Sequence, residues 1–179
     1  MLCQVCRKKS YLTRFLFCHD YKNAVSRELI HAFKYGFVQE LAIPLSGFLI
    51  KMIKEYKIRL QKTMIVIPVP LHSAKLRKRG FNQSELIAKN FAGHFGLNMV
   101  HGNLARKKNT EPQIEMSDFQ KRKDNIMDAF EVLRPDEFKN KKIILIDDVS
   151  TSRSTMEEAA KVLKNAGAKS IWGMVIAKG

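Results

Sequence analysis

The sequence predicts an α/β fold in which a mostly parallel central sheet is flanked by helices. Three short apolar segments rich in β-branched residues have the pattern of strands, at 64–69, 142–146 and 170–177. Continuous apolar runs of this length are typical of strands buried on both faces, as in a parallel sheet. Helical patterns lie between these strands, and that alternation favours parallel pairing.

The composition fits a globular domain, because 45% of the 179 residues are hydrophobic and 27% are charged. Lys and Arg number 32 against 17 acidic residues, so the formal net charge is +15. This excess points to anionic partners such as phosphates, nucleic acid or an acidic membrane surface, with a merely solvated basic surface as the alternative. Since the sequence has no membrane-spanning apolar run and no secretory-signal pattern, we expect a cytoplasmic protein without a membrane span.

The first half of the chain divides into a short leader and the start of the main domain. We expect residues 1–20, which contain all three cysteines, to form the leader, and residues 21–179 to form the domain. Residues 21–56 have helical apolar spacing, with breaks expected at Gly36 and Pro44.

The segments around the first strand are predicted from polar and capping residues. A basic loop is expected over 70–80, followed by a helix that starts at Asn82 and stops at Gly96. Residues 101–127 are polar with little periodicity, and we expect a long loop there. Loops of this length in compact domains often act as active-site lids.

The last third of the chain completes the sheet. A short strand is expected at 129–133, then the strand at 142–146, a helix ending at Gly167 and the final strand. Ligands of parallel α/β sheets bind at the carboxyl ends of strands. That rule directs attention to residues 70–80 and 147–155.

The clearest chemical signal is two adjacent acids, Asp147 and Asp148, followed by a hydroxyl-rich turn over 150–155. Carboxylates at a strand end can accept hydrogen bonds from vicinal sugar hydroxyls or approach Mg²⁺. The turn offers hydroxyls and backbone amides beside a helix N-terminus, which favours a phosphate. Together these groups suit a ribose 5-phosphate. Simple helix capping is the alternative, and it is weaker because both acids directly follow a buried strand.

This segment resembles the ribose-phosphate signature of phosphoribosyltransferases: a hydrophobic strand, two acids and a Thr/Gly-rich loop. Over residues 21–179 the chain also resembles the ComF family of competence proteins. The most family-specific piece is Arg79-Gly-Phe-Asn-Gln83. The other pieces that carry the resemblance are 28–35, 68–72, 104–113, Arg122 with Asn125, 129–130 and 143–155.

The resemblance implies a type I phosphoribosyltransferase-like fold with a long basic lid loop, and phosphoribosyl pyrophosphate (PRPP) with magnesium as the donor. It also implies a link to the uptake of single-stranded DNA, with competence-machinery proteins as candidate partners, and a homodimer, which is frequent among transferases of this fold. By the same resemblance, the catalytic acids that hold the ribose hydroxyls would be Asp147 and Asp148. The ribose-phosphate cradle would extend through Val149, Ser150, Thr151, Ser152, Arg153, Ser154 and Thr155.

The turn departs from the family signature at one position. The usual Thr-Thr-Gly is here Thr151-Ser152-Arg153. Arginine stands where a small residue lets the backbone approach the phosphate, and where a positive φ is expected. Arg153 would either bind the phosphate through its guanidinium or block the pocket.

Basic residues are concentrated between positions 56 and 110, where eleven Lys/Arg accompany one acid, Glu85. Those after the first strand fall where this fold places its pyrophosphate loop, and those in the long loop fall where it places a lid. Positive groups there would stabilise departing pyrophosphate, and lid closure would exclude water. A solvated basic face and a track for nucleic-acid phosphates remain as alternatives. The residues concerned are Lys75, Arg77, Lys78, Arg79, Arg106, Lys107 and Lys108.

Cys3 and Cys6 form a C-x-x-C pair, with Cys18 and His19 further along. These four residues are the candidate zinc ligands, since a tetrahedral site needs four. The ComF resemblance implies two C-x-x-C pairs, and the second would need a cysteine at Tyr21. The sequence therefore favours a degenerate remnant of a zinc site.

Two functions follow from these residues. The first is a phosphoribosyltransferase that displaces pyrophosphate at the anomeric carbon; because no general base is evident, catalysis would come from positioning and electrostatics. The second is a catalytically impaired module that keeps the fold and binds single-stranded DNA or a DNA-uptake partner. The acceptor of the transfer reaction is left open.

Overall fold

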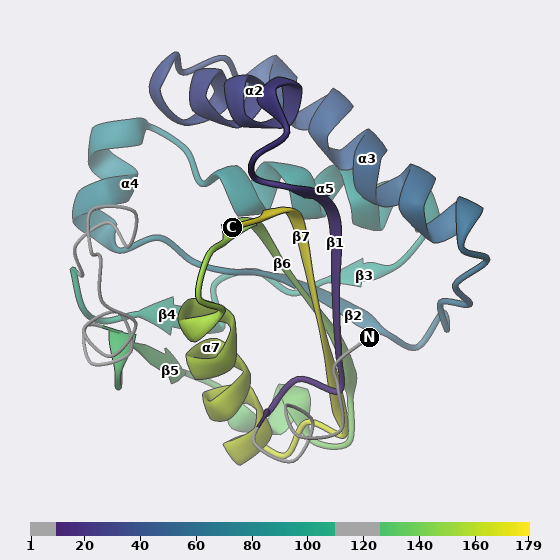
Figure 1. The fold of residues 1–179 in the computed structure, drawn as a ribbon. Coiled ribbons are helices and arrows are strands. Elements are labelled where there is room, and N and C mark those ends of the chain that lie inside the picture. Colours follow the sequence, from purple (N-terminus) through teal and green to yellow (C-terminus); the bar gives the residue numbers. More distant parts are fainter. Residues whose placement is uncertain (1–9, 110–125) are drawn as a thin grey trace.

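The structure, a computed structural model, describes residues 10–109 and 126–179. Its central sheet has five strands, all parallel, in the order β1-β7-β6-β2-β3 (Figure 1). These are β1 (Arg14–Asp20), β2 (Ile65–Pro68), β3 (Asn98–Met99), β6 (Lys142–Ser150) and β7 (Ser170–Lys178). A separate antiparallel pair joins β4 (Leu104–Arg106) to β5 (Phe130–Val132).

Helices cover both faces of the sheet, which confirms the predicted α/β class (Figure 1). One face carries α2 (Ala24–Tyr35), α3 (Ala42–Glu55) and α5 (Gln83–Phe95), and the other carries α7 (Ser154–Asn165). Short α4 (Ser73–Arg79) follows β2, while η1 (Gln39–Leu41) and η3 (Pro135–Phe138) are single 3₁₀ turns. Within the described ranges, no helix combines the length and apolarity needed to cross a membrane.

Strand β6 lies inside the sheet and positions the predicted acids. Its residues Ile143–Ile146 are fully buried, because alternate side chains enter the core on opposite sides of the sheet. Hydrophobic burial on both faces therefore fixes this strand, as its continuous apolar run predicts. The strand extends beyond the predicted end at 146, through both acids to Ser150, and Asp147 pairs with Val175 of β7.

Part of the segment predicted as a separate leader belongs to the central sheet. Residues 14–20, placed in the leader by the sequence, form β1 at the sheet edge and pair in parallel with β7. The side chain of Phe15 is buried in the core. Edge strands show weaker apolar patterns than central strands, and this explains why the pattern was missed. The cysteines Cys3 and Cys6 lie outside the described residues.

Three local predictions also need correction. The basic loop over 70–80 contains α4, which is capped by the His72 side chain and ends at Gly80 with a φ of 77°. The long loop over 101–127 contributes β4, and its residues 110–125 lie outside the described part. Pro44 does not break a helix: it occupies the first turn of α3, where its missing N–H has no intrahelical partner to lose.

Candidate functional site

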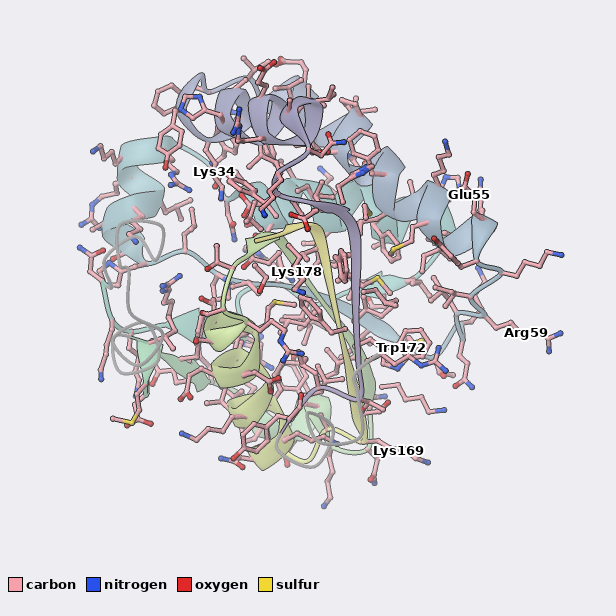
Figure 2. The ribbon with its side chains drawn as sticks, viewed as in Figure 1. Lys34, Glu55, Arg59, Lys169, Trp172 and Lys178 are labelled. Carbon is pink, nitrogen blue, oxygen red and sulfur yellow. The ribbon has the colours of Figure 1, made fainter. Side chains whose placement is uncertain are left out.

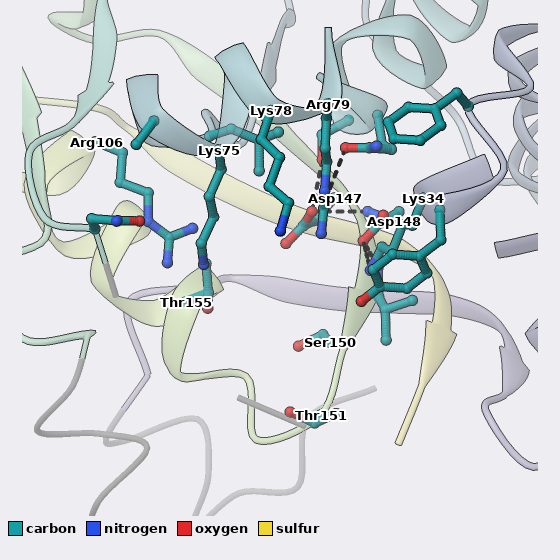
Figure 3. Close-up of a pocket in the computed structure, with 18 residues that line it drawn as sticks. Lys34, Lys75, Lys78, Arg79, Arg106, Asp147, Asp148, Ser150, Thr151 and Thr155 are labelled. Carbon is teal, nitrogen blue, oxygen red and sulfur yellow. Dashed lines mark hydrogen bonds and ion pairs between the residues drawn. The ribbon is translucent and has the colours of Figure 1, made fainter. Parts of the chain in front are cut away.

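A cavity of about 550 Å³ opens beyond the carboxyl ends of β2 and β6 (Figure 3). Its two sides differ in chemistry. We call residues 147–155 the strand-end segment; it supplies carboxylates and hydroxyls from β6 and the following turn. The opposite side is the cationic wall, whose side chains come from three elements: Lys34 of α2, Lys75, Lys78 and Arg79 of α4, and Arg106 of β4.

The fold brings most, but not all, of the predicted residues to this cavity. On the strand-end segment, Ser152, Arg153 and Ser154 do not line it. The lining members are Asp147, Asp148, Val149, Ser150, Thr151 and Thr155.

The predicted basic residues divide in the same way. Arg77, Lys107 and Lys108 are exposed and do not line the cavity. Lys107 lies 4.0 Å from the Glu131 carboxylate, and Lys108 donates a hydrogen bond to the Met127 carbonyl. The other predicted basic residues, Lys75, Lys78, Arg79 and Arg106, all belong to the cationic wall.

Asp148 is held by an ion pair that connects the two sides of the cavity. Its side chain is buried, and its Oδ1 lies 3.0 Å from Lys34 Nζ and accepts a hydrogen bond of 2.6 Å from the Val149 amide. Figure 2 shows Lys34 beneath α2, whereas Glu55 and Arg59 point outward. Burial alone would lower the pKa of Lys34, but the charge and hydrogen bond of Asp148 and the charge of Asp147 together outweigh burial and raise that pKa. Lys34 therefore stays protonated and is the cation that faces Asp148.

Asp147, the next residue, has a different environment. Its Oδ1 accepts hydrogen bonds from Ser84 Oγ at 2.7 Å and from the Asp148 amide at 2.9 Å. Burial, followed by the nearby Asp148 charge, raises the pKa of Asp147 from 3.8 to about 6. Asp147 can therefore gain a proton under mildly acidic conditions.

Arg153 takes up neither of the two positions expected for it. Its φ of 63° and ψ of 0° place it in the left-handed region, as the glycine of the family signature would suggest. Its guanidinium carbon lies 5.6 Å from the centre of the Phe15 ring, in a cation–π arrangement. The side chain therefore packs against β1 and does not line the cavity.

Several cavity residues were missed by sequence reasoning. Lys34, Ser84 and Gln83 look like polar residues of ordinary helices, and only the packing of α2 and α5 brings them to the acids. The available signals were the segments 28–35 and 79–83, which contain Lys34 and Gln83 and carried the family resemblance without an assigned role for these residues. Tyr35 and Phe37 were also missed, because only the packing of α2 and the chain after it brings them to the cavity.

Of the four candidate zinc ligands, Cys18 and His19 lie among the described residues, and Cys3 and Cys6 lie outside them. Cys18 packs against the core, and burial raises the pKa of its thiol to about 12, which disfavours the thiolate that binds metal. The His19 ring stands edge-on to Phe48 at 4.8 Å. Over residues 10–109 and 126–179, no group of three or more His, Cys, Asp or Glu residues could hold a metal ion.

Comparison with known proteins identifies the class of domain to which this chain belongs. Residues 78–179 match the phosphoribosyl transferase domain family, and the chain belongs to that family.

The resemblance to competence proteins is also confirmed. Competence protein F of Haemophilus influenzae is 31% identical over 112 residues, covering 61% of this chain and 48% of the relative. DNA utilization protein YhgH of Salmonella typhimurium is 29% identical over 160 residues (88% and 69%). Competence protein ComFC of Bacillus subtilis is 27% identical over 162 residues (89% and 54%). The chain thus spans about half the length of the two competence proteins.

Proposed function

We propose that this chain binds PRPP together with magnesium and transfers its phosphoribosyl group to an acceptor, releasing pyrophosphate. The observation that carries this proposal is the pairing of two chemistries in one cavity. Carboxylates and hydroxyls line one side, and cations from three elements line the other. PRPP carries the complementary groups, since it has two vicinal hydroxyls, a 5-phosphate and a diphosphate.

Each side of the cavity would have a separate task in the reaction. Asp147 and Asp148 would accept hydrogen bonds from the ribose hydroxyls, while Ser150, Thr151 and Thr155 would donate to the 5-phosphate. The bond from the anomeric carbon to pyrophosphate breaks, and its electron pair leaves with the pyrophosphate. A lone pair of the acceptor forms the new bond at that carbon. The cationic wall stabilises the charge that develops on the leaving group, which is an electrostatic contribution.

The donor set fits a magnesium ion that arrives with its substrate. Mg²⁺ prefers oxygen ligands and usually binds through one or two carboxylates plus substrate phosphates and water. Asp147 and Asp148 would supply the carboxylates, and the described residues contain no larger cluster of acids that would form a cage of protein ligands. When bound, the ion would neutralise charge on the diphosphate.

Isothermal titration with PRPP and magnesium tests the proposal, with two neighbouring cations as a matched pair. We expect Lys78→Gln to weaken PRPP binding about tenfold, because Lys78 lines the cavity and a charge-assisted contact contributes about 1.5 kcal/mol. Arg77→Gln is the control, because this substitution removes one positive charge at the neighbouring position, which is exposed. Equal losses in both variants would mean that net charge, not the cavity, governs binding.

The second candidate function is a non-catalytic module for single-stranded DNA or a DNA-uptake partner. The favouring observation is that Arg77, Lys107 and Lys108 lie exposed outside the cavity. Relatives are named for competence and DNA utilization. A gel-shift assay with an oligothymidylate over a salt series would measure this binding. DNA binding that is unchanged in Asp148→Asn, together with no PRPP binding by the wild type, would support this function.

A further inference from the structure

The two edges of the central sheet differ in length and therefore in their ability to pair with another chain. Strand β3 at one edge has only two residues, whereas β1 at the other edge has seven and contains no proline. Among the described residues, β1 has a neighbouring strand on one side only, which is β7 (Figure 1). Proteins commonly shorten or interrupt their edge strands, because a long open edge is a template for pairing. Strand β1 is therefore a candidate interaction surface.

The backbone of β1 determines which residues can bond to a further strand. Thr13 and Tyr21, which flank β1, both donate amide hydrogen bonds of 2.7 Å to carbonyls of β7. Since a strand directs the N–H and C=O groups of successive residues to opposite sides, the odd-numbered residues of β1 bond to β7. The even-numbered residues, with Leu16 and Cys18 at the middle of the strand, direct their backbone groups toward the open edge.

The side chains of β1 are apolar at its centre and oppositely charged at its ends. Phe17, the central residue, is 42% exposed. Arg14 at the start and Asp20 at the end are both exposed. The Arg14 guanidinium carbon lies 4.4 Å from the centre of the Trp172 ring, and Asp20 Oδ1 accepts a hydrogen bond of 3.2 Å from the Lys22 amide. These contacts keep one charge of each sign at opposite ends of the strand.

This arrangement makes β1 complementary to a second copy of itself. Antiparallel pairing of two β1 strands about Phe17 brings Arg14 of each copy opposite Asp20 of the other. Leu16 then lies opposite Cys18, and Phe17 lies opposite Phe17 of the second copy. The backbone fits the same register, because Leu16 and Cys18 become a hydrogen-bonded pair through their outward groups. Moving the register by two residues in either direction would separate Arg14 from Asp20 and lose both ion pairs.

We propose that β1 pairs with β1 of a second copy of this chain and joins the two five-stranded sheets into one. Asp20 lies opposite Lys178 in the register with β7, so in the dimer it has a cation on each side, the other being Arg14 of the second copy. The net charge of +15 opposes association, but salt screens exposed charges beyond about 8 Å and leaves these short contacts. The antiparallel arrangement places the two cavities at opposite ends of the joined sheet, so both stay open to ligand.

Disulfide cross-linking tests the register. In the proposed pair the two Phe17 Cα atoms lie about 4.5 Å apart, which is within the range that a disulfide spans. Phe17→Cys should therefore form a covalent dimer on mild oxidation, and mass spectrometry of the linked peptides should show position 17 joined to itself. Thr13→Cys is the control: position 13 is also exposed, but its two copies would lie about 27 Å apart along the strands. Equal cross-linking of the two variants, or none in Phe17→Cys, would overturn the proposal.

A charge exchange tests the ion pairs at the strand ends. Sedimentation equilibrium at about 100 μM, which detects association of micromolar Kd, should show the wild type to be dimeric. Arg14→Asp should weaken the dimer about tenfold, because it sets two acids opposite each other at both ends, and adding Asp20→Arg to it should restore association.

Lys51→Asp is the control for the exchange, because it makes the same change of charge at an exposed position on α3. A monomeric wild type would overturn the proposal, as would a double variant that associates no better than Arg14→Asp. Because β1 does not line the cavity, PRPP affinity should be the same in all these variants. PRPP binding and pairing through β1 can therefore fail independently.

Discussion

The two sides of the cavity are built in different ways. The strand-end segment is one continuous stretch, positioned by a single buried strand and the turn before α7. The cationic wall is assembled from α2, α4 and β4, which lie far apart in the sequence. The acidic side therefore depends on local chain geometry, whereas the basic side depends on how separate elements pack.

Lys34 is where the two sides meet, so its removal is expected to have the largest effect. Lys34→Met leaves the Asp148 carboxylate buried without its cation, which should cost about 3 kcal/mol of unfolding free energy. Urea denaturation would measure this loss. Lys51→Met is the control, because Lys51 forms an exposed pair with Glu55 and should cost less than about 1 kcal/mol. Similar small losses in both variants would show that water replaces Lys34 as the partner of Asp148.

The pH dependence of stability reports on Asp147 of the strand-end segment. Because the pKa of Asp147 is raised from 3.8 to about 6 in the folded state, the native protein binds this proton more tightly than the unfolded chain does. Unfolding free energy should therefore fall as the pH rises from 3.8 to about 6, and this contribution should be constant above that range.

Denaturation curves of the wild type and Asp147→Asn across this pH range would isolate the contribution. The asparagine can still accept the hydrogen bonds from Ser84 and the Asp148 amide, so the difference between the two curves reports the titration. Parallel curves for the two proteins would contradict the raised pKa.

Arg153 is expected to have the smallest effect, since it belongs to the strand-end segment but does not line the cavity. Both Arg153→Gly and Arg153→Ala remove the contact with Phe15, but only glycine relieves the left-handed backbone. We expect the glycine variant to be about 1 kcal/mol more stable than the alanine variant. Thermal denaturation would measure this difference, and PRPP affinity in Arg153→Gly should change less than about threefold. A large gain in PRPP affinity would instead mean that Arg153 obstructs the cavity.

Much of the fold was predictable because its central strands are buried on both faces. Ile143–Ile146 and the helix from Asn82 to Gly96 have patterns that local physics explains, through hydrophobic burial and capping. Strand β1 was missed because an edge strand needs only part of its surface to be apolar. Helix α4 was missed because its seven residues, five of them polar or basic, carry no clear helical stripe.

The sequence by itself determined the acidic side of the site, because two acids after an apolar strand and before a hydroxyl-rich turn are adjacent in the chain. Only the tertiary structure decided which cations and aromatic rings face those acids. It joined Lys34 to Asp148, placed Ser84 against Asp147 and directed Arg153 toward Phe15. The physical reason is that adjacent residues on one buried strand are fixed by local geometry, whereas contacts between distant residues exist only once the helices have packed on the sheet.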